Sequence, residues 1–229
     1  MTLKLGVPSK GRLMDKTVAW FADRGIMIRR KGDDRDSAGV VEGIDGVDLM
    51  LLSAGEIPRE LSAGRIHLGV TGSDLIREKL AGWDQKVETL TGMGFGAADL
   101  VIAVPAGWID VDTLDDLDAV AAAFRMVHGE RLRIATKYHR LAREFLRNAG
   151  VADYQLVDSQ GATEGTVRHE TAEAVIDITS TGDTLRANGL KILSDGLIHQ
   201  SQATLFRAHN ADWSDAARAA LAEVRARIG

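Results

Sequence analysis

Residues 180–184 read Ser-Thr-Gly-Asp-Thr and place hydroxyl groups and a glycine directly after the short apolar run Val175–Ile178. The β-branched run is typical of a buried strand, and Leu185 and Leu190 indicate a helix after the turn. Hydroxyls and free backbone N–H groups at such a turn bind anions, because they converge on the positive end of the helix dipole. The turn therefore predicts a cradle for one phosphate. Ordinary helix capping uses the same residue types, and composition alone leaves the two interpretations about even.

Asp177, near the end of the predicted strand, favours the phosphate interpretation. A carboxylate does not bind phosphate, but its oxygens accept hydrogen bonds from the hydroxyls of a sugar. A phosphate site beside a sugar site indicates a phosphoribosyl group as the ligand.

Strand, turn and helix patterns of this kind recur along the chain, which is typical of an α/β protein with largely parallel sheets. Apolar strand patterns at residues 3–7, 47–52, 67–70 and 132–135 precede the turns PSKGR, SAGE, TGSD and TKY, each followed by helical spacing of apolar residues. Ligands of parallel sheets collect at the carboxyl ends of the strands. We therefore expect these turns and the 180–184 turn to line one cleft.

Two glycine-containing passages, at residues 90–105 and 195–206, lead into apolar strands. We interpret them as crossings of the chain between two domains. The predicted domains are residues 1–92 with 200–229, and residues 93–199, the second of which carries the phosphate turn. The final amphipathic segment is expected to form a helix that packs on the first domain.

Composition narrows the class of ligand. A formal net charge of −5 and a pI near 5.7 over 229 residues argue against a dedicated nucleic-acid binder and favour small metabolites. The lack of cysteine excludes disulfides, a thiolate nucleophile and Cys-ligated metal sites. The N-terminus lacks the apolar stretch of a signal peptide, and no apolar run reaches membrane-spanning length. We expect a soluble cytoplasmic protein without membrane or nucleic-acid partners.

Six motifs, in this order, resemble the ATP phosphoribosyltransferases in their short form, over nearly the whole chain. They are Lys10-Gly11-Arg12, Glu56-Ile57-Pro58, LGVTGSDL at 68–75, GFG at 94–96, ATKY at 135–138 and DITSTGDTLRANGL at 177–190. Each motif is weak alone, and their shared order together with the long final block makes the resemblance strong.

The resemblance implies transfer of the 5-phosphoribosyl group of phosphoribosyl pyrophosphate to N1 of ATP, with Mg²⁺ and release of pyrophosphate, as the first step of histidine biosynthesis. It also implies a bilobal α/β fold like the type II periplasmic binding proteins, with two mixed or parallel sheets, flanking helices and the active site between the lobes. On this basis the 5-phosphate would be held by Ser180, Thr181, Gly182, Asp183 and Thr184.

The same resemblance assigns catalytic roles to two acidic and two basic residues. Glu164 and Asp177 would face the ribose hydroxyls or Mg²⁺. Lys10 and Arg12, with Gly11 between them, would contact substrate phosphates and stabilise the leaving pyrophosphate. Without the resemblance, a lysine and an arginine beside a turn would be interpreted as solvated. Weaker assignments, as contacts to ATP, fall on Thr71, Gly72, Lys137 and Tyr138.

Two segments depart from the family pattern. Residues 53–55, Ser-Ala-Gly, stand where relatives often carry arginine or lysine before the Asp/Glu-Ile-Pro motif. An anion contact there is either missing or supplied by Arg30, Arg35 or Arg59. Residues 160–167, QGATEGTV, replace the S-G-S-V-E pattern of many relatives but keep Gly161 and Glu164.

Two other functions remain open at this point: a small-anion solute-binding protein with the same bilobal fold, and a phosphoribosyltransferase for another base. Short-form relatives assemble with a separate subunit resembling the catalytic core of histidyl-tRNA synthetase, in a hetero-oligomer that histidine inhibits. The segment after Phe206 holds one amphipathic helix, too little for a further sensor core. We therefore expect a homodimer that is insensitive to histidine when alone.

Overall fold

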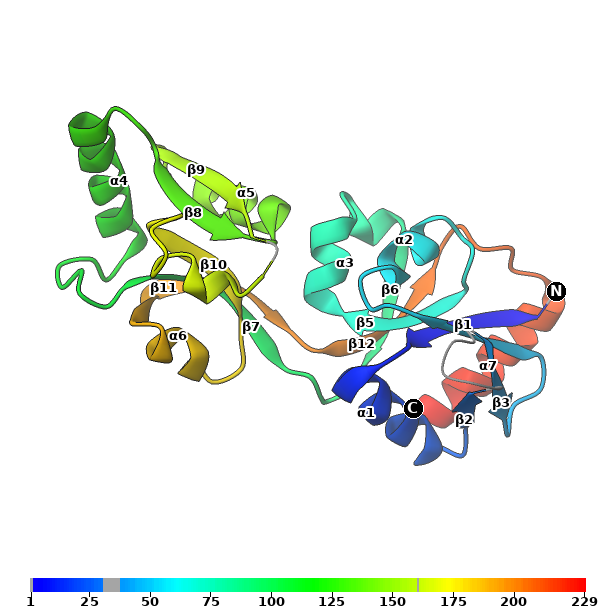
Figure 1. Cartoon of the computed structure of the whole chain (residues 1–229). Coiled ribbons are helices and arrows are strands. Elements are labelled where there is room, and N and C mark those ends of the chain that lie inside the picture. Colours follow the sequence, from blue (N-terminus) through cyan, green and yellow to red (C-terminus); the bar gives the residue numbers. More distant parts are fainter. Residues whose placement is uncertain (1, 31–37, 160) are drawn as a thin grey trace. The chain divides into compact units, whose positions relative to one another are not determined.

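The structure is a computed structural model that describes residues 2–30, 38–159 and 161–229 (Figure 1). It divides the chain into two compact units, named here unit 1 (Met1–Gly96 with Gln202–Gly229) and unit 2 (Ala97–Ser201). The chain passes between the units after residues 96 and 201, inside the two passages interpreted as crossings. Both boundaries lie a few residues further along the chain than the predicted domain limits.

Unit 1 is built on a mixed sheet with a parallel centre. Its described strands follow the order β2-β3-β4-β1-β5-β12-β6. β1 (Leu3–Pro8) runs parallel to β4 (Val47–Leu52) on one side and to β5 (Leu68–Gly72) on the other. The remaining strands pair antiparallel with their neighbours: β2 (Met27–Arg30), β3 (Ala38–Glu42), β6 (Val87–Gly92) and β12 (Ala203–Ala208).

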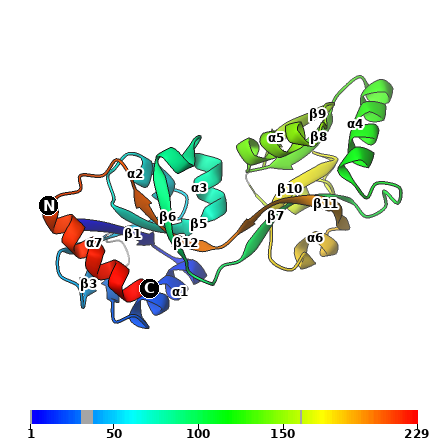
Figure 2. The same cartoon turned by 180° about the vertical axis from the view of Figure 1, so that it is seen from behind.

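Helices cover both faces of this sheet (Figure 2). One face packs on α1 (Gly11–Ala22) and α7 (Asp215–Ile228), the other on α2 (Ile57–Ser62) and α3 (Ser73–Lys79), which the short helix η1 (Trp83–Gln85) follows. Gly69 of β5 explains the close approach of α2, because a Cβ there would lie 2.7 Å from the Ile57 side chain. As expected, the final helix packs on the first domain.

Unit 2 has a second mixed sheet, whose described strands follow the order β11-β7-β10-β8-β9. β8 (Leu132–Thr136) lies between β9 (Tyr154–Asp158) and β10 (Ala174–Thr179) and is parallel to both. β7 (Ala98–Pro105) pairs antiparallel with β10 and with β11 (Leu190–Ser201). The helices are α4 (Leu114–His128) and α5 (His139–Asn148) on one face, α6 (Asp183–Ala187) on the other, and the short η2 (Thr163–Gly165).

The helix after the phosphate turn is shorter than its apolar spacing suggests. α6 ends at Ala187, and Leu190 is the first residue of β11. Gly189 has a φ of 72°, and its N–H donates to the Arg186 carbonyl, which stops the helix before Leu190. The predicted α/β class with two mixed sheets and flanking helices is confirmed.

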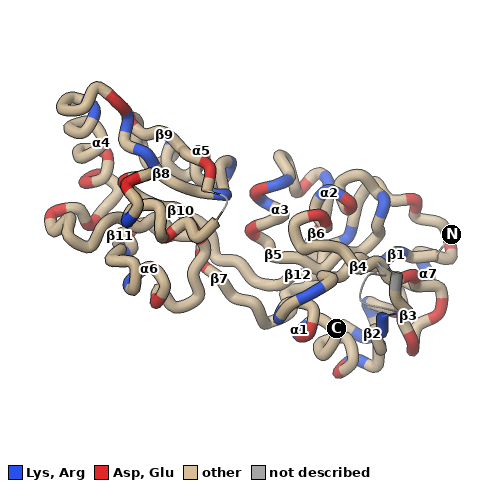
Figure 3. The backbone as a smooth tube through the Cα atoms, in the orientation of Figure 1, with Lys and Arg blue, Asp and Glu red and all other residues tan. Residues whose placement is uncertain are grey.

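Acidic and basic residues are interspersed along the backbone of both units, as Figure 3 shows. Within the described ranges, no helix combines the length and apolarity that crossing a membrane requires.

Candidate functional site

The predicted site residues of unit 2 follow three parallel strands. β9, β8 and β10 run in the same direction, with Thr136 of β8 opposite both Asp158 and Ile176. The segments after these strands therefore leave from one edge of the sheet. They carry Lys137 after β8, Glu164 after β9, and the 180–184 turn after β10.

Asp177 is the centre of a charged cluster at this edge. Burial raises the pKa of its carboxyl group, and the negative charge of Glu164 acts in the same direction. The Ile178 N–H, which donates to Asp177 Oδ1 at 2.9 Å, and the charge of Lys137 oppose this shift. Asp177, Glu164 and Lys137 are thus close enough to influence one another electrostatically.

Lys137 also fixes the loop that carries Glu164. Its Nζ donates to the Gly161 carbonyl at 2.6 Å and ties the end of β8 to the segment after β9. The next residue, Tyr138, is buried instead. It is 6% exposed and packs in the core under α5. Its burial favours a structural role over the predicted contact with ATP.

Thr163 is a neighbour of Asp177 that sequence reasoning missed. It is 0% exposed, and its Oγ1 makes no hydrogen bond of ordinary geometry within the described residues. The hydroxyl nevertheless lies close enough to the Asp177 carboxyl group to lower the pKa of that group. Thr163 stands at an apolar position of the family pattern, so the sequence carried no signal for this role.

Hydrogen bonds fix the 180–184 turn to itself and to its neighbours. Gly182 has a φ of 74°, and its N–H donates to Thr179 Oγ1 at 2.8 Å. The Ser180 hydroxyl donates to the Ala97 carbonyl at 3.1 Å. The Thr184 side chain is exposed, and its hydroxyl has no protein partner in the described part of the chain. Thr184 therefore offers the turn's most available donor for an anion.

Arg186 braces the turn and was not predicted. Its Nη2 donates to the Thr181 carbonyl at 2.8 Å and to Asp183 Oδ1 at 2.6 Å. The Thr181 hydroxyl also donates to Asp183, and these two partners lower the pKa of the Asp183 carboxyl group. Arg186 thus partly offsets a negative charge that would repel phosphate. The i, i+3 spacing of Asp183 and Arg186 was the available sequence signal.

The remaining predicted residues lie in unit 1, after β1 and at the end of β5. Lys10, Gly11 and Arg12 are exposed at the start of α1, where Gly11 has a φ of 76°. Within the described residues, neither Lys10 nor Arg12 forms an ion pair.

Thr71, at the end of β5, is buried. It is 0% exposed, and its hydroxyl donates to the Ala54 carbonyl at 2.9 Å. Its burial favours a structural link from β5 to the loop after β4, with the neighbouring Gly72 partly exposed.

The loop at residues 53–56 lacks the basic residue that relatives often carry, and its Ser53 donors bind the carboxylate of Glu56 from the same loop. The Ser53 N–H and hydroxyl donate to Glu56 Oε2 at 3.0 and 2.7 Å and lower the pKa of the Glu56 carboxyl group. Among the three arginines considered as replacements, Arg30 donates to the Ser9 carbonyl beside Lys10. Arg59 instead pairs with Glu60 at 3.1 Å. Arg35, like Gln160 of the second departing segment, lies outside the described residues.

The turns expected to line one cleft thus form two groups, one on each unit. Lys137, Glu164, Asp177 and the 180–184 turn lie together on unit 2, whereas Lys10–Arg12 and Thr71–Gly72 lie at the corresponding sheet edge of unit 1. The group on unit 2 suits a phosphorylated sugar. Its lysine and hydroxyls can bind phosphate, and its half-buried carboxylates can accept hydrogen bonds from sugar hydroxyls.

Solved structures with similar folds include an ATP phosphoribosyl transferase (HisG:HisZ) complex from Thermotoga maritima, with a TM-score of 0.74 and 21% identity over 99% of this chain and 96% of that one. An ancestral arginine-binding protein bound to arginine has a TM-score of 0.52 at 14% identity, over 98% of this chain and 92% of that one. Sequence identities this low mean that the matches show the fold alone. The matched folds confirm the predicted likeness of the fold to periplasmic binding proteins.

Sequence comparison goes further. A protein described as ATP phosphoribosyltransferase from Cereibacter sphaeroides is 70% identical over 229 residues, which is 100% of this chain and 97% of the relative. Another from Bradyrhizobium diazoefficiens is 51% identical over 214 residues, 93% of this chain and 66% of that longer relative. The family model HisG, ATP phosphoribosyltransferase, matches residues 53–229. Together with the phosphate turn and its acidic neighbours, these matches show that the chain belongs to the ATP phosphoribosyltransferase family.

Proposed function

We propose that this chain transfers the 5-phosphoribosyl group of phosphoribosyl pyrophosphate to N1 of ATP and releases pyrophosphate, the first step of histidine biosynthesis. Unit 2 binds the donor, with the 5-phosphate on the 180–184 turn and the ribose hydroxyls at Asp177 and Glu164. The observation that carries this assignment is that the turn with the exposed Thr184 hydroxyl and the Asp177 cluster belong to the same edge of the unit 2 sheet.

The reaction needs charge stabilisation more than a covalent residue. When N1 of ATP attacks the ribose carbon, the bond to pyrophosphate breaks, positive charge builds on the ribose and negative charge on the leaving group. Asp177 and Glu164 would stabilise the ribose, and Lys10 and Arg12 the phosphates. The exposure of Lys10 and Arg12, and their lack of ion pairs among the described residues, leave them available for this role.

Mg²⁺ fits these residues as an ion carried by the substrate. The described residues contain no group of three or more acidic, histidine or cysteine side chains that could hold a metal by themselves. Mg²⁺ characteristically combines one or two carboxylates with substrate phosphates, and Glu164 and Asp177 provide such carboxylates. When bound, the ion would neutralise charge on the pyrophosphate oxygens.

The proposal includes a regulatory partner. The similar Thermotoga maritima structure is a complex of HisG with HisZ. A corresponding subunit, resembling the catalytic core of histidyl-tRNA synthetase, would bind this chain in a hetero-oligomer. The chain alone would be a homodimer, and a cytoplasmic location belongs to the same proposal.

The test is an assay of the purified chain with phosphoribosyl pyrophosphate, Mg²⁺ and either ATP or a panel of free bases. Formation of phosphoribosyl-ATP and pyrophosphate supports the proposal. Transfer to another base would identify a different phosphoribosyltransferase. Anion binding without turnover, with and without the partner subunit, would favour a solute-binding function.

A further inference from the structure

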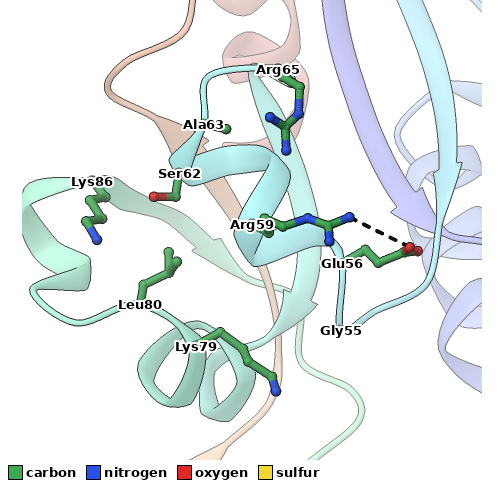
Figure 4. A pocket seen from close by; sticks show the side chains of 9 residues that line it. All are labelled: Gly55, Glu56, Arg59, Ser62, Ala63, Arg65, Lys79, Leu80 and Lys86. Carbon is green, nitrogen blue, oxygen red and sulfur yellow. Dashed lines mark ion pairs between the residues drawn. The ribbon is translucent and has the colours of Figure 1, made fainter.

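A pocket of about 730 Å³ opens in unit 1 (Figure 4). Its lining includes Arg59, one of the three arginines considered above for a substrate anion contact, and Glu56 of the Glu56-Ile57-Pro58 motif, but none of the residues assigned to the transfer reaction. Three segments supply most of its walls: α2 with the turn after it, the end of α3, and the segment before β6. Gly55 and Glu56, from the loop before α2, also line it. The volume lies in the range of about 300–1,000 Å³ that is typical of small-molecule sites.

Four cationic side chains from these three segments line the pocket: Arg59, Arg65, Lys79 and Lys86. Glu56 is the acidic residue among the lining side chains, although the whole chain has a net charge of −5. Arg59 and Lys79 lie in the last turns of α2 and α3, where the helix dipole favours cations. Arg65 and Lys86 lie beyond the helices, so the dipole does not account for them.

Glu60 of α2, which is not among the lining residues, pairs with the two arginines. It is 9% exposed and accepts hydrogen bonds from Arg65 Nε at 2.5 Å, Arg65 Nη2 at 2.9 Å and Arg59 Nε at 3.1 Å. These bonds, that of Arg65 first, lower the pKa of Glu60 to about 2. Each guanidinium has five N–H donors, so donors remain for a ligand after these contacts.

Two lysines add to the positive charge of the lining. Lys79 and Lys86 form no ion pair within the described residues, and they come from segments other than those of the two arginines. Ser62 adds a hydroxyl, and the buried Leu80 adds an apolar surface (Figure 4).

From this arrangement we propose that the pocket binds a small molecule carrying a di- or triphosphate group. Glu60, and Glu56 at 3.9 Å from Arg59 Nη2, offset part of the charge of the arginines, and the two lysines keep the lining positive (Figure 4). Guanidinium and ammonium groups together suit several phosphate oxygens. An organic body, where present, rests against Leu80. The shared chemistry covers a nucleoside diphosphate and inorganic pyrophosphate. This site is additional to the proposed transfer reaction and does not depend on it.

The test is a titration of the isotope-labelled full chain with ADP and, separately, with inorganic pyrophosphate, followed by the amide signals of Ser62 and Ala63 and the methyl signals of Leu80. The variant that carries Lys79→Gln and Lys86→Gln removes two charges and leaves the Glu60 pairs intact. A matched control with Lys4→Gln and Lys16→Gln has the same net charge and exposed positions outside the pocket.

Saturable shifts of these signals at millimolar ligand, with a Kd about tenfold higher in the pocket variant and unchanged in the control, support the proposal. Tighter binding of ADP than of pyrophosphate would identify the nucleotide as the ligand, and the reverse order would identify the inorganic anion. The absence of shifts with both probes, or equal Kd values in the pocket variant and the control, would overturn it. Because the signals belong to the pocket, binding at the phosphate turn does not produce this result.

Discussion

At the scale of single residues, the hydroxyls of the phosphate turn differ in what they are free to do. The Ser180 and Thr181 hydroxyls donate to protein acceptors, whereas that of Thr184 is exposed and has no partner among the described residues. Phosphate binding should therefore depend most on Thr184.

We expect Thr184→Val to lower kcat/KM for phosphoribosyl pyrophosphate by roughly ten- to a hundredfold, the equivalent of one lost hydrogen bond to a charged group. The melting temperature should stay the same, because the hydroxyl contacts no protein group in the described structure. Steady-state kinetics and a thermal melt check this, with Thr89→Val on the exposed face of β6 as the matched control. Unchanged kinetics in a folded variant would remove Thr184 from the site.

Asp177 and Glu164 should matter for turnover and little for folding. Burial raises the pKa of the Asp177 carboxyl group, so the folded state binds its proton more tightly than the unfolded chain does. The stabilising contribution is therefore present at low pH and is lost as pH rises through the folded pKa. We expect Asp177→Asn at neutral pH to keep or gain stability while kcat falls.

Glu164→Gln should behave in the same way for kcat, because it loses a charge that acts on the ribose. Comparison of kcat with the denaturation midpoint for each variant separates the two effects. A variant that loses stability yet keeps full kcat would show a structural role for its carboxylate.

At the scale of elements, two local features can be tested. The backbone conformation of Gly182 shapes the 180–184 turn, and the ion pairs of Glu60 stabilise helix α2. Gly182 has a φ of 74°, and a Cβ there would lie 2.8 Å from Arg186 Nη1. Glu60 joins α2 to the turn after it through Arg65.

Gly182→Ala should destabilise the protein by about 1–2 kcal/mol, because a side chain in the left-handed region is strained. It should also displace Arg186 and weaken the use of phosphoribosyl pyrophosphate. Gly182→Asn, which tolerates this backbone conformation better, serves as the comparison. Equal stability of the alanine variant and the parent in denaturant titrations would contradict the described turn.

Glu60→Gln should lower the free energy of unfolding by about 1 kcal/mol at neutral pH, a modest value because both arginine partners are more than half exposed. The pKa of Glu60 is lowered from 4.5 to about 2, so its contribution is present above 4.5 and is lost as pH falls toward 2. Denaturation midpoints measured across this window should fall in the parent and change less in the variant. Parallel pH profiles would contradict the pairing.

At the scale of the whole molecule, the described residues form two units with one sheet each, and the motifs of the proposed reaction are divided between them. We expect the isolated chain to be insensitive to histidine, since a ligand regulates only by binding two activity states with different affinity. Co-expression with a subunit of the HisZ kind should raise activity and confer inhibition.

Titration of the purified chain with histidine, with and without that subunit, measures both effects. Inhibition of the chain alone at micromolar histidine would contradict the expectation and place a sensor site on these two units. Light scattering of the same sample checks the expected homodimer.

The amino-acid sequence was enough to predict the strand–turn–helix order, the turn at residues 180–184 and the family, because these depend on local patterns of apolar spacing, glycine and hydroxyl residues. That this turn binds phosphate stays a prediction. The sequence could not determine which side chains are buried or already hydrogen-bonded to other parts of the protein. Only the packed structure showed that Thr71 and Tyr138 are buried and that Thr163 lies beside Asp177. The Asp183–Arg186 pair and the end of α6 at Ala187 depend instead on local features, an i, i+3 spacing and Gly189. The basic pocket of unit 1 could not be predicted from the sequence either, because its four basic residues belong to no common motif. They are Arg59, Arg65, Lys79 and Lys86. Burial and long-range pairing come from strands packed across the sheet, and no local spacing encodes them.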